Sequence, residues 1–314
     1  MGGFVSASHK NNKKNMKIIE SDVSILKQEP GIEGLYKHME TVGRISHMSE
    51  SKGSPEDFIE RIKKLGHWAV FDLGTVYLRF PYEFCSIDGC DRIYDILGNK
   101  WTIDVKDQGF HHITTTFRSI LKLGCLDLME KLWCDPIPGV HEERLTSKWV
   151  CSRAIGNELV RHRAFSFIQE STRFINYSRE KFGTELVYIV PEWVEKFRVP
   201  GEDDSLSKVE LWEKYVSSVP VISRRNKTWK EAEEEYLWET QEKILVPGDA
   251  RGCLPGDLKT TIYMCGFLKD YYETPEPGST EKLGFFYLRE APDAHPDIRV
   301  LAEKLNREIH ENKE

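Results

Sequence analysis

The sequence predicts an α+β fold, in which mixed helices pack on a mostly antiparallel sheet. The 314 residues are 39% hydrophobic and 30% charged, a balance typical of a soluble globular protein. Residues 55–65 and the segment after Pro296 carry apolar side chains at helical spacing, whereas 185–195 is rich in strand-forming residues. These helices and strands do not alternate in the βαβ rhythm of a doubly wound sheet, which favours α+β.

The N-terminal part is expected to be a tail over residues 1–30, followed by one domain over 31–314. Residues 1–15 are polar and rich in lysine, and they lack the apolar core of a secretion signal. Residues 55–65 begin with Pro-Glu-Asp and predict a helix that ends before Gly66. Residues 68–80 then predict an extended strand.

The middle of the chain, over residues 82–146, is less regular. Within it, 117–133 predicts one or two helices around Gly124. Residues 148–162 have apolar positions that suit a helix, and 185–195 predicts a strand that ends at a proline.

The C-terminal part predicts two helices. Residues 227–246 form a strongly charged segment with an apolar stripe at Trp229, Ala232 and Tyr236. The last helix opens at Pro296, with His295 expected to cap it.

Charge and cysteine content exclude several classes of protein. A net charge of −7 argues against a general nucleic-acid binder, and no apolar run approaches the roughly 20 residues of a membrane span. The seven cysteines follow no disulfide framework, so we expect reduced thiols and a cytoplasmic location. Cys85 and Cys90, with His111 and His112, fit no zinc spacing, and no metal site is predicted.

The most informative segment is 161–174, which holds three arginines, one histidine and three hydroxyl side chains between aromatic residues. Guanidinium groups bind phosphate in a fork geometry, and hydroxyls with free backbone N–H groups complete an anion-binding loop. Composition alone fits a basic helix end followed by a solvated loop equally well.

The order of these residues resembles the signature of flavin-dependent thymidylate synthases. Arg161-His162-Arg163 is followed by seven residues, then Ser171, then Arg173 and an aromatic residue. Further elements of that family occur in the same order over roughly 35–80 and 148–310. They are 43–46 (Gly-Arg-Ile-Ser), Gly66-His67, Arg153 with Glu158, 250–255 (Ala-Arg-Gly-Cys-Leu-Pro), 285–289 (Phe-Phe-Tyr-Leu-Arg) and 294–299 (Ala-His-Pro-Asp-Ile-Arg).

The sequence also departs from the family pattern. Residues 82–146 are longer than the usual link, and 273–282 interrupt a segment that is normally continuous. Compared with the family, we therefore expect an insertion at about 82–146 and a short one at about 273–282. Gly284 stands where Asn or His is usual, Gln169 where several members have Glu, and Phe174 where Tyr is common.

The resemblance implies a thymidylate synthase-complementing protein-like fold and methylation of dUMP to dTMP. It implies FAD as cofactor, NADPH and methylene-tetrahydrofolate as co-substrates, and a homotetramer with active sites between subunits. Arg289 would be catalytic, at the uracil ring. The residues that would contact dUMP are Glu158, Arg161, Gln169, Glu170, Ser171, Thr172, Arg173, Arg251 and Arg289. Those that would contact FAD or folate are Ser46, His67, Arg161, His162, Arg163 and Gln169.

Three rival interpretations remain at this point. A synthase with a cysteine nucleophile would need a Pro-Cys-His context, which none of the cysteines has. A nucleic-acid-binding module is opposed by the acidic balance. A flavin- or nucleotide-binding homologue without activity is the third. Arg44 fits either an ion pair or a flavin contact.

Overall fold

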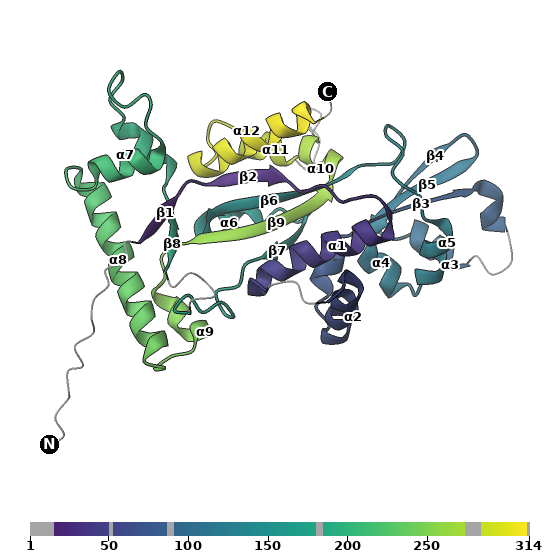
Figure 1. Cartoon of the computed structure of the whole chain (residues 1–314). Helices are drawn as coiled ribbons and strands as arrows, with labels where there is room; N and C mark the ends of the chain where they lie inside the picture. The colour runs from purple at the N-terminus through teal and green to yellow at the C-terminus, as the bar shows by residue number, and fades with distance from the viewer. Residues whose placement is uncertain (1–15, 50–52, 87–90, 180–184, 274–283, 313–314) are drawn as a thin grey trace.

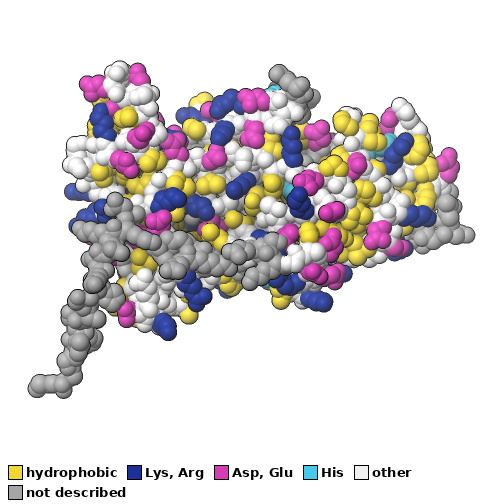
Figure 2. Space-filling model, viewed as in Figure 1, with side chains coloured by type: hydrophobic (Ala, Val, Ile, Leu, Met, Phe, Trp, Pro, Cys, Tyr) yellow, Lys and Arg dark blue, Asp and Glu magenta, His cyan; other side chains and the backbone are white. Residues whose placement is uncertain are grey.

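A computed structural model describes residues 16–49, 53–86, 91–179, 185–273 and 284–312. A four-stranded sheet lies at its centre, between a helical region at one end and a small three-stranded sheet at the other (Figure 1). Acidic and basic side chains are interspersed over the face drawn in Figure 2. No helix in the described ranges is long and apolar enough to span a bilayer.

The central sheet is antiparallel, in the order β2-β6-β9-β7. Its strands are β2 (Asp22–Ile25), β6 (Arg144–Ser152), β9 (Lys259–Phe267) and β7 (Ser166–Gln169). Side chains along β9 alternate between two buried cores, because successive residues of a strand point to opposite faces. Ile262 and Met264 belong to one core, and Tyr263 and Cys265 to the other.

Helices cover both faces of this sheet (Figure 1). One face carries α6 (Arg153–Leu159), α10 (Leu268–Tyr272), α11 (Phe285–Arg289) and α12 (Pro296–Glu311). The other carries α1 (Gly31–Arg44), η1 (Ile45–His47), α2 (Pro55–Leu65) and η2 (Trp68–Asp72). Because β7 is an edge strand, the loop after Gln169 emerges where these two layers meet.

The three-stranded sheet has the order β3-β5-β4 and is antiparallel. Its region comprises β3 (Thr75–Pro81), η3 (Tyr82–Ser86), α3 (Asp91–Leu97), β4 (Ile103–Asp107), β5 (Phe110–Thr116), α4 (Phe117–Lys122) and α5 (Leu126–Leu132). Its buried side chains share one core with α1 and α2, so this segment packs directly against the layer that carries η1 and η2.

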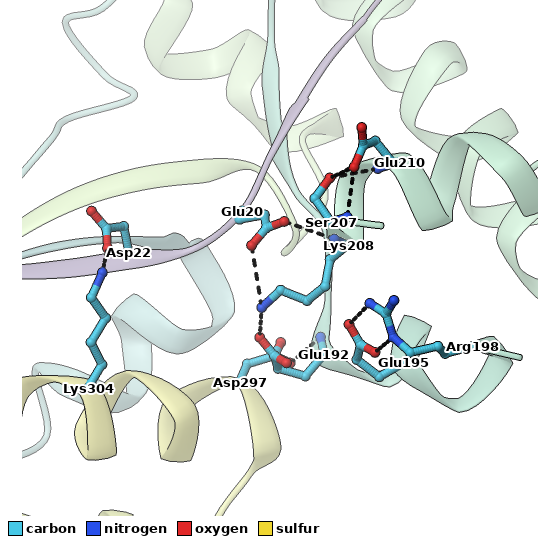
Figure 3. A network of polar contacts seen from close by, with 10 residues as sticks. All are labelled: Glu20, Asp22, Glu192, Glu195, Arg198, Ser207, Lys208, Glu210, Asp297 and Lys304. Atoms are coloured by element: carbon cyan, nitrogen blue, oxygen red, sulfur yellow. Dashed lines mark hydrogen bonds and ion pairs between the residues drawn. The ribbon is translucent and has the colours of Figure 1, made fainter. Parts of the chain in front are cut away.

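The helical region surrounds a stack of aromatic rings. It comprises the parallel pair β1 (Lys17–Ile19) and β8 (Val187–Ile189), with η5 (Glu192–Phe197), α7 (Lys208–Tyr215), α8 (Pro220–Gln241), α9 (Pro247–Ala250) and η6 (Arg251–Cys253). Trp212 and Tyr188 stack on opposite sides of Trp229, at 4.7 and 4.9 Å between ring centroids. Figure 3 shows how η5 joins this region to α12: the Glu192 backbone N–H donates to Asp297, while the Glu192 side chain forms an ion pair with Lys208 of α7.

The structure confirms the predicted fold class and several elements. The helix at 55–65 forms with a Ser54–Asp57 capping box, and Gly66 ends it at a φ of 71°. Gly124 separates α4 from α5. The last helix starts at Pro296, and His295 caps it by accepting a hydrogen bond from the Asp297 backbone N–H.

Four predictions of local structure were wrong. The predicted tail over 1–30 contains β1 and β2, which pair with β8 and β6, while residues 1–15 lie outside the described ranges. Residues 68–72 form a 3₁₀ helix, and the strand begins only at Thr75. Residues 148–152 belong to β6 because they pair with β9, so the helix starts at Arg153. The charged helix spans 220–241, because Pro220 starts it, and Pro247 begins the short α9.

Candidate active site

Three predicted site residues meet at one point between α6 and α11. The Arg289 Nε donates a hydrogen bond to His162 Nε2 at 2.7 Å, and its NH1 donates to Glu158 Oε2 at 3.2 Å. Glu158 lies in the last turn of α6, His162 follows that helix, and Arg289 ends α11. The two acceptors fix the guanidinium in one orientation, and the side chain is 20% exposed.

The contact with Arg289 determines the protonation of His162. Arginine can only donate, so His162 Nε2 must accept and the ring proton must be on Nδ1. Burial, followed by the adjacent Arg289 charge, lowers the pKa of His162 to about 4. The ring packs edge-on against Phe285, at 5.0 Å between centroids. His162 is therefore neutral at neutral pH.

The loop after β7 is held from inside by Glu170. This buried carboxylate accepts hydrogen bonds from Lys259 Nζ at 2.6 Å, from the Tyr177 hydroxyl at 3.1 Å and from the Thr261 backbone N–H at 3.1 Å. Burial, followed by the Glu170 charge, raises the pKa of Tyr177, which keeps its hydroxyl as a donor. The Glu170 side chain, predicted to contact the nucleotide, is thus committed to internal partners.

The next residues of this loop leave backbone donors available. Neither Ser171 nor Thr172 has an acceptor for its backbone N–H in the part of the chain that the structure describes. The Ser171 hydroxyl accepts from the Arg173 backbone N–H at 3.3 Å, which shapes the turn. Two adjacent free N–H groups in a turn are a site for an anion.

Arginines adjoin this turn from two other segments. A β-carbon at Gly248 would lie 3.9 Å from the Arg173 carbonyl oxygen, so α9 packs against the turn just before Arg251. Burial, and to a smaller extent the charge of Arg251, lowers the pKa of Arg153. Within the described ranges, no carboxylate forms an ion pair with Arg153, Arg173 or Arg251. Neighbouring cations without a counter-ion favour binding of an anion.

A hollow of about 740 Å³ lies on the other side of Gln169. It is lined by Ser46 from η1, His67 before η2, Gln169 at the end of β7 and Ser171 after it, so it brings together three of the six residues predicted to contact FAD or folate. The Gln169 amide donates to Thr260 Oγ1 at 3.2 Å, and a β-carbon at Gly156 would be only 3.2 Å from it. Gly156 thus allows close packing of this side chain against α6.

The remaining predicted residues are placed as follows. Arg161 and Arg163 are exposed, and their side chains have no hydrogen-bond or ion-pair partner among the described residues, so this chain alone does not bring them to the hollow. Arg44 pairs with Glu40 (Nε to Oε1, 2.9 Å), which accounts for it without a ligand. Residues 274–283, which include most of the predicted short insertion, lie outside the described ranges.

Three of the described cysteines, Cys134, Cys151 and Cys253, do not provide an activated nucleophile. Burial raises the pKa of Cys134 and Cys253 to about 11 and that of Cys151 to about 12, so these thiols stay protonated at neutral pH. No group of three metal-ligating side chains occurs among the described residues. Cys90 lies outside the described ranges.

Sequence reasoning missed three contributors to the site. Arg153 was noticed only as part of a motif, because its spacing of five residues from Glu158 does not place the two side chains on one face of the helix. Lys259 and Tyr177, which hold Glu170, gave no local signal.

The fold and the site together define an α+β protein in which unpaired arginines adjoin a turn with free backbone N–H groups, beside a hollow lined by apolar and polar side chains. A sequence model of the family described as thymidylate synthase complementing protein matches residues 144–312, more than half of the chain. The chain therefore belongs to this family. The match includes Arg161, Arg251 and Arg289, whereas Ser46 and His67 lie before it.

Curated relatives carry the name flavin-dependent thymidylate synthase. The protein from Pyrococcus abyssi is 28% identical over 167 residues, which are 52% of this chain and 53% of the relative. The one from Pyrococcus furiosus is 29% identical over 162 residues, 51% of either chain. The chain thus spans about half the length of the curated relatives it matches.

A solved structure of the UMP/dUMP methylase PolB from Streptomyces cacaoi, bound with 5-Br UMP, is also similar. It is 14% identical, with a TM-score of 0.39, and the similarity covers 92% of this chain and 88% of that one. Similarity at this level supports no argument about the site.

Proposed function

We propose that this chain is a flavin-dependent thymidylate synthase that methylates dUMP to dTMP. Methylene-tetrahydrofolate would donate the carbon, and FAD reduced by NADPH would donate the hydride. The observation that carries the proposal is the Arg289 guanidinium, oriented by neutral His162 and by Glu158 and still partly exposed. Membership of the family supports the same conclusion.

Arg289 would stabilise negative charge that develops on the uracil ring during the reaction. Its Nε–H and one NH1 proton are used by His162 and Glu158, so NH2 and the second NH1 proton remain to donate. A donor fixed before the reaction needs no reorganisation as the charge appears, which is the most effective form of electrostatic stabilisation.

The nucleotide phosphate would bind where the unpaired arginines adjoin the β7 loop. Arg173 and Arg251 supply charge, and the N–H groups of Ser171 and Thr172 supply short-range donors. Glu170 would position this turn from behind, through Lys259 and the Thr261 backbone, without touching the ligand.

The flavin would occupy the hollow beside Gln169. Its volume of about 740 Å³, its hydroxyls and its aromatic floor suit a planar heteroaromatic ring with polar edges. When bound, reduced FAD would supply the hydride that completes the methyl group. Ser46 and Gln169 would donate to or accept from ring atoms, and His67 would lie at the mouth, near the folate.

The active site would be completed by neighbouring subunits of a homotetramer. Large apolar side chains are exposed beside the site arginines, including Val160 (40%), Phe174 (56%), Val246 (63%) and Leu288 (36%). Apolar surface of this kind is typical of a subunit interface. Arg161 and Arg163, whose side chains have no partner in the described chain, would then face the FAD of an adjacent subunit.

We keep the cytoplasm as the proposed location, because Cys125, Cys134, Cys151, Cys253 and Cys265 are free.

The proposal is tested with the purified full chain, supplied with FAD, NADPH, dUMP and methylene-tetrahydrofolate. We expect FAD to copurify, its absorbance to change when dUMP binds, and dTMP to form only when flavin is present. A folded protein that forms no dTMP under these conditions, or that forms it without flavin, would refute the proposal.

A further inference from the structure

The charged side chains that line the hollow containing Ser46 and His67 are all basic. Two arginines, Arg61 and Arg118, line it together with His67, and its described lining includes no aspartate or glutamate. This is notable in a chain with a net charge of −7. A concave surface with cations and no carboxylates attracts and retains anions.

Arg118 comes from the segment 82–146 and lies before residues 144–312, the part of the chain that the family model matches. It is the second residue of α4, whose N-terminus is fixed by the Thr116 side chain and by a hydrogen bond from the Phe117 backbone N–H to Gly74. Phe117 also packs edge-on against Phe71 of η2, at 5.6 Å between centroids. The segment is therefore anchored on the same 3₁₀ helix that borders the hollow.

The Arg118 guanidinium is held at one terminal nitrogen, and its side chain is still partly exposed. Its NH1 donates to Asp72 Oδ2 at 2.5 Å, while the side chain is 32% exposed. Asp72 itself does not line the hollow. A guanidinium has five N–H donors, so this contact sets the orientation and leaves the other donors for a ligand.

We propose that Arg118 binds an anionic group of the molecule that occupies this hollow. The group is a phosphate of the flavin cofactor or a carboxylate of the folate, since both are oxyanions that a guanidinium recognises by its fork geometry. This inference rests on the proposed function and adds to it a role for the segment 82–146: supplying a ligand-binding cation to the flavin and folate side of the site.

The test measures binding, and not turnover, in the full-length protein. Dissociation constants for FAD, FMN and riboflavin, and for tetrahydrofolate and its dimethyl ester, are compared between wild type and Arg118→Gln. Arg92→Gln is the matched control, because Arg92 comes from the same segment and pairs with Asp127 on the surface (2.8 Å). Arg118→Lys serves as a second variant if the glutamine variant does not fold.

We expect Arg118→Gln to weaken binding of the charged ligand roughly tenfold, as loss of one charge-assisted hydrogen bond does. Weaker FAD and FMN binding with unchanged riboflavin binding identifies a flavin phosphate. Weaker tetrahydrofolate binding with an unchanged ester identifies a folate carboxylate. Arg118→Lys should weaken the same ligand to a smaller extent, since it keeps the charge but loses the fork.

The inference is overturned if Arg118→Gln binds every ligand as wild type does, if charged and uncharged ligands weaken equally, or if Arg92→Gln has the same effect. A wild-type protein that binds neither flavin nor folate refutes the proposed function itself, and this inference with it. A wild type that binds both, with no selective loss in Arg118→Gln, leaves the proposed function intact and refutes only the role of Arg118.

Discussion

Arg289 and Arg251 are both proposed to contact the same nucleotide, yet their surroundings differ. Arg289 is held by His162 and Glu158 and is only 20% exposed on its side chain. The Arg251 side chain has no hydrogen-bond or ion-pair partner within the described ranges and lies near another cation, Arg153. A group that must stabilise a transition state benefits from being fixed beforehand, whereas a group that binds phosphate equally throughout needs only charge and reach.

The largest effect is expected from Arg289→Lys. Lysine keeps the charge but loses the planar fork, so it cannot satisfy His162 and Glu158 and also donate to the ring. Loss of one preorganised donor lowers turnover about a hundredfold. Steady-state kinetics with saturating flavin would measure this, with FAD content as the control for folding. A variant with normal turnover and only a raised KM would assign Arg289 to binding.

A smaller effect of a different kind is expected from Arg251→Lys. The phosphate is bound equally in the ground state and the transition state. Loss of the Arg251 contact therefore raises the KM for dUMP, about tenfold, more than it lowers kcat. The same kinetic series measures it. A drop in kcat at unchanged KM would show that Arg251 acts on the chemical step. The proposed difference in role between Arg251 and Arg289 would then be wrong.

Glu158→Gln should change turnover only about threefold, the scale of a partly exposed ion pair. The amide oxygen of glutamine still accepts from Arg289 NH1, so the geometry survives and only the opposite charge is lost. Turnover reduced as far as in Arg289→Lys would mean that the carboxylate itself takes part in the reaction.

His162→Gln should change the acid stability and leave stability at neutral pH nearly unaltered. The folded pKa of His162 is about 4, below its usual 6.5. Between these values the unfolded chain binds a proton that the folded chain does not, so stability falls as pH falls through this window. Glutamine can accept from Arg289 without titrating.

Urea unfolding of wild type and His162→Gln at pH 7.5 and pH 5 measures this difference. The wild type should lose more stability on acidification than the variant. His38, whose pKa is also lowered to about 4 by burial, contributes equally to both proteins. An identical loss in the two proteins would show that His162 is not held neutral by Arg289.

The sequence predicted elements whose signals are local and missed those fixed by distant partners. The α2 helix was found because its capping box and terminal glycine are adjacent in the chain. Residues 148–162 were predicted to be a helix because Val150, Ile155 and Leu159 suit helical spacing. Residues 148–152 are instead the end of β6, because they pair with β9, more than a hundred residues later. β1 and β2 were missed for the same reason.

In the site as well, features with a local sequence signal were predicted, and features fixed by distant residues were not. The arginines and the RHR motif were found from their order along the chain, and the structure places Glu158, His162 and Arg289 in contact. The internal role of Glu170 depends on Lys259 and Tyr177, which no local pattern connects to it. Likewise, Arg118 is oriented by a residue that precedes it by 46 positions.

The division of roles between Arg289 and Arg251 is tested most directly by comparing dUMP with deoxyuridine, which lacks the phosphate. Binding of both ligands is followed by the change in flavin absorbance in wild type, Arg251→Lys and Arg289→Lys. We predict that Arg251→Lys weakens dUMP about tenfold and leaves deoxyuridine unchanged, since one charge-assisted contact to phosphate is lost. Arg289→Lys should keep the wild-type ratio of the two affinities. Equal weakening of both ligands by Arg251→Lys, or a loss of the preference for dUMP in Arg289→Lys, would contradict the assignment of the phosphate and ring ends of the site.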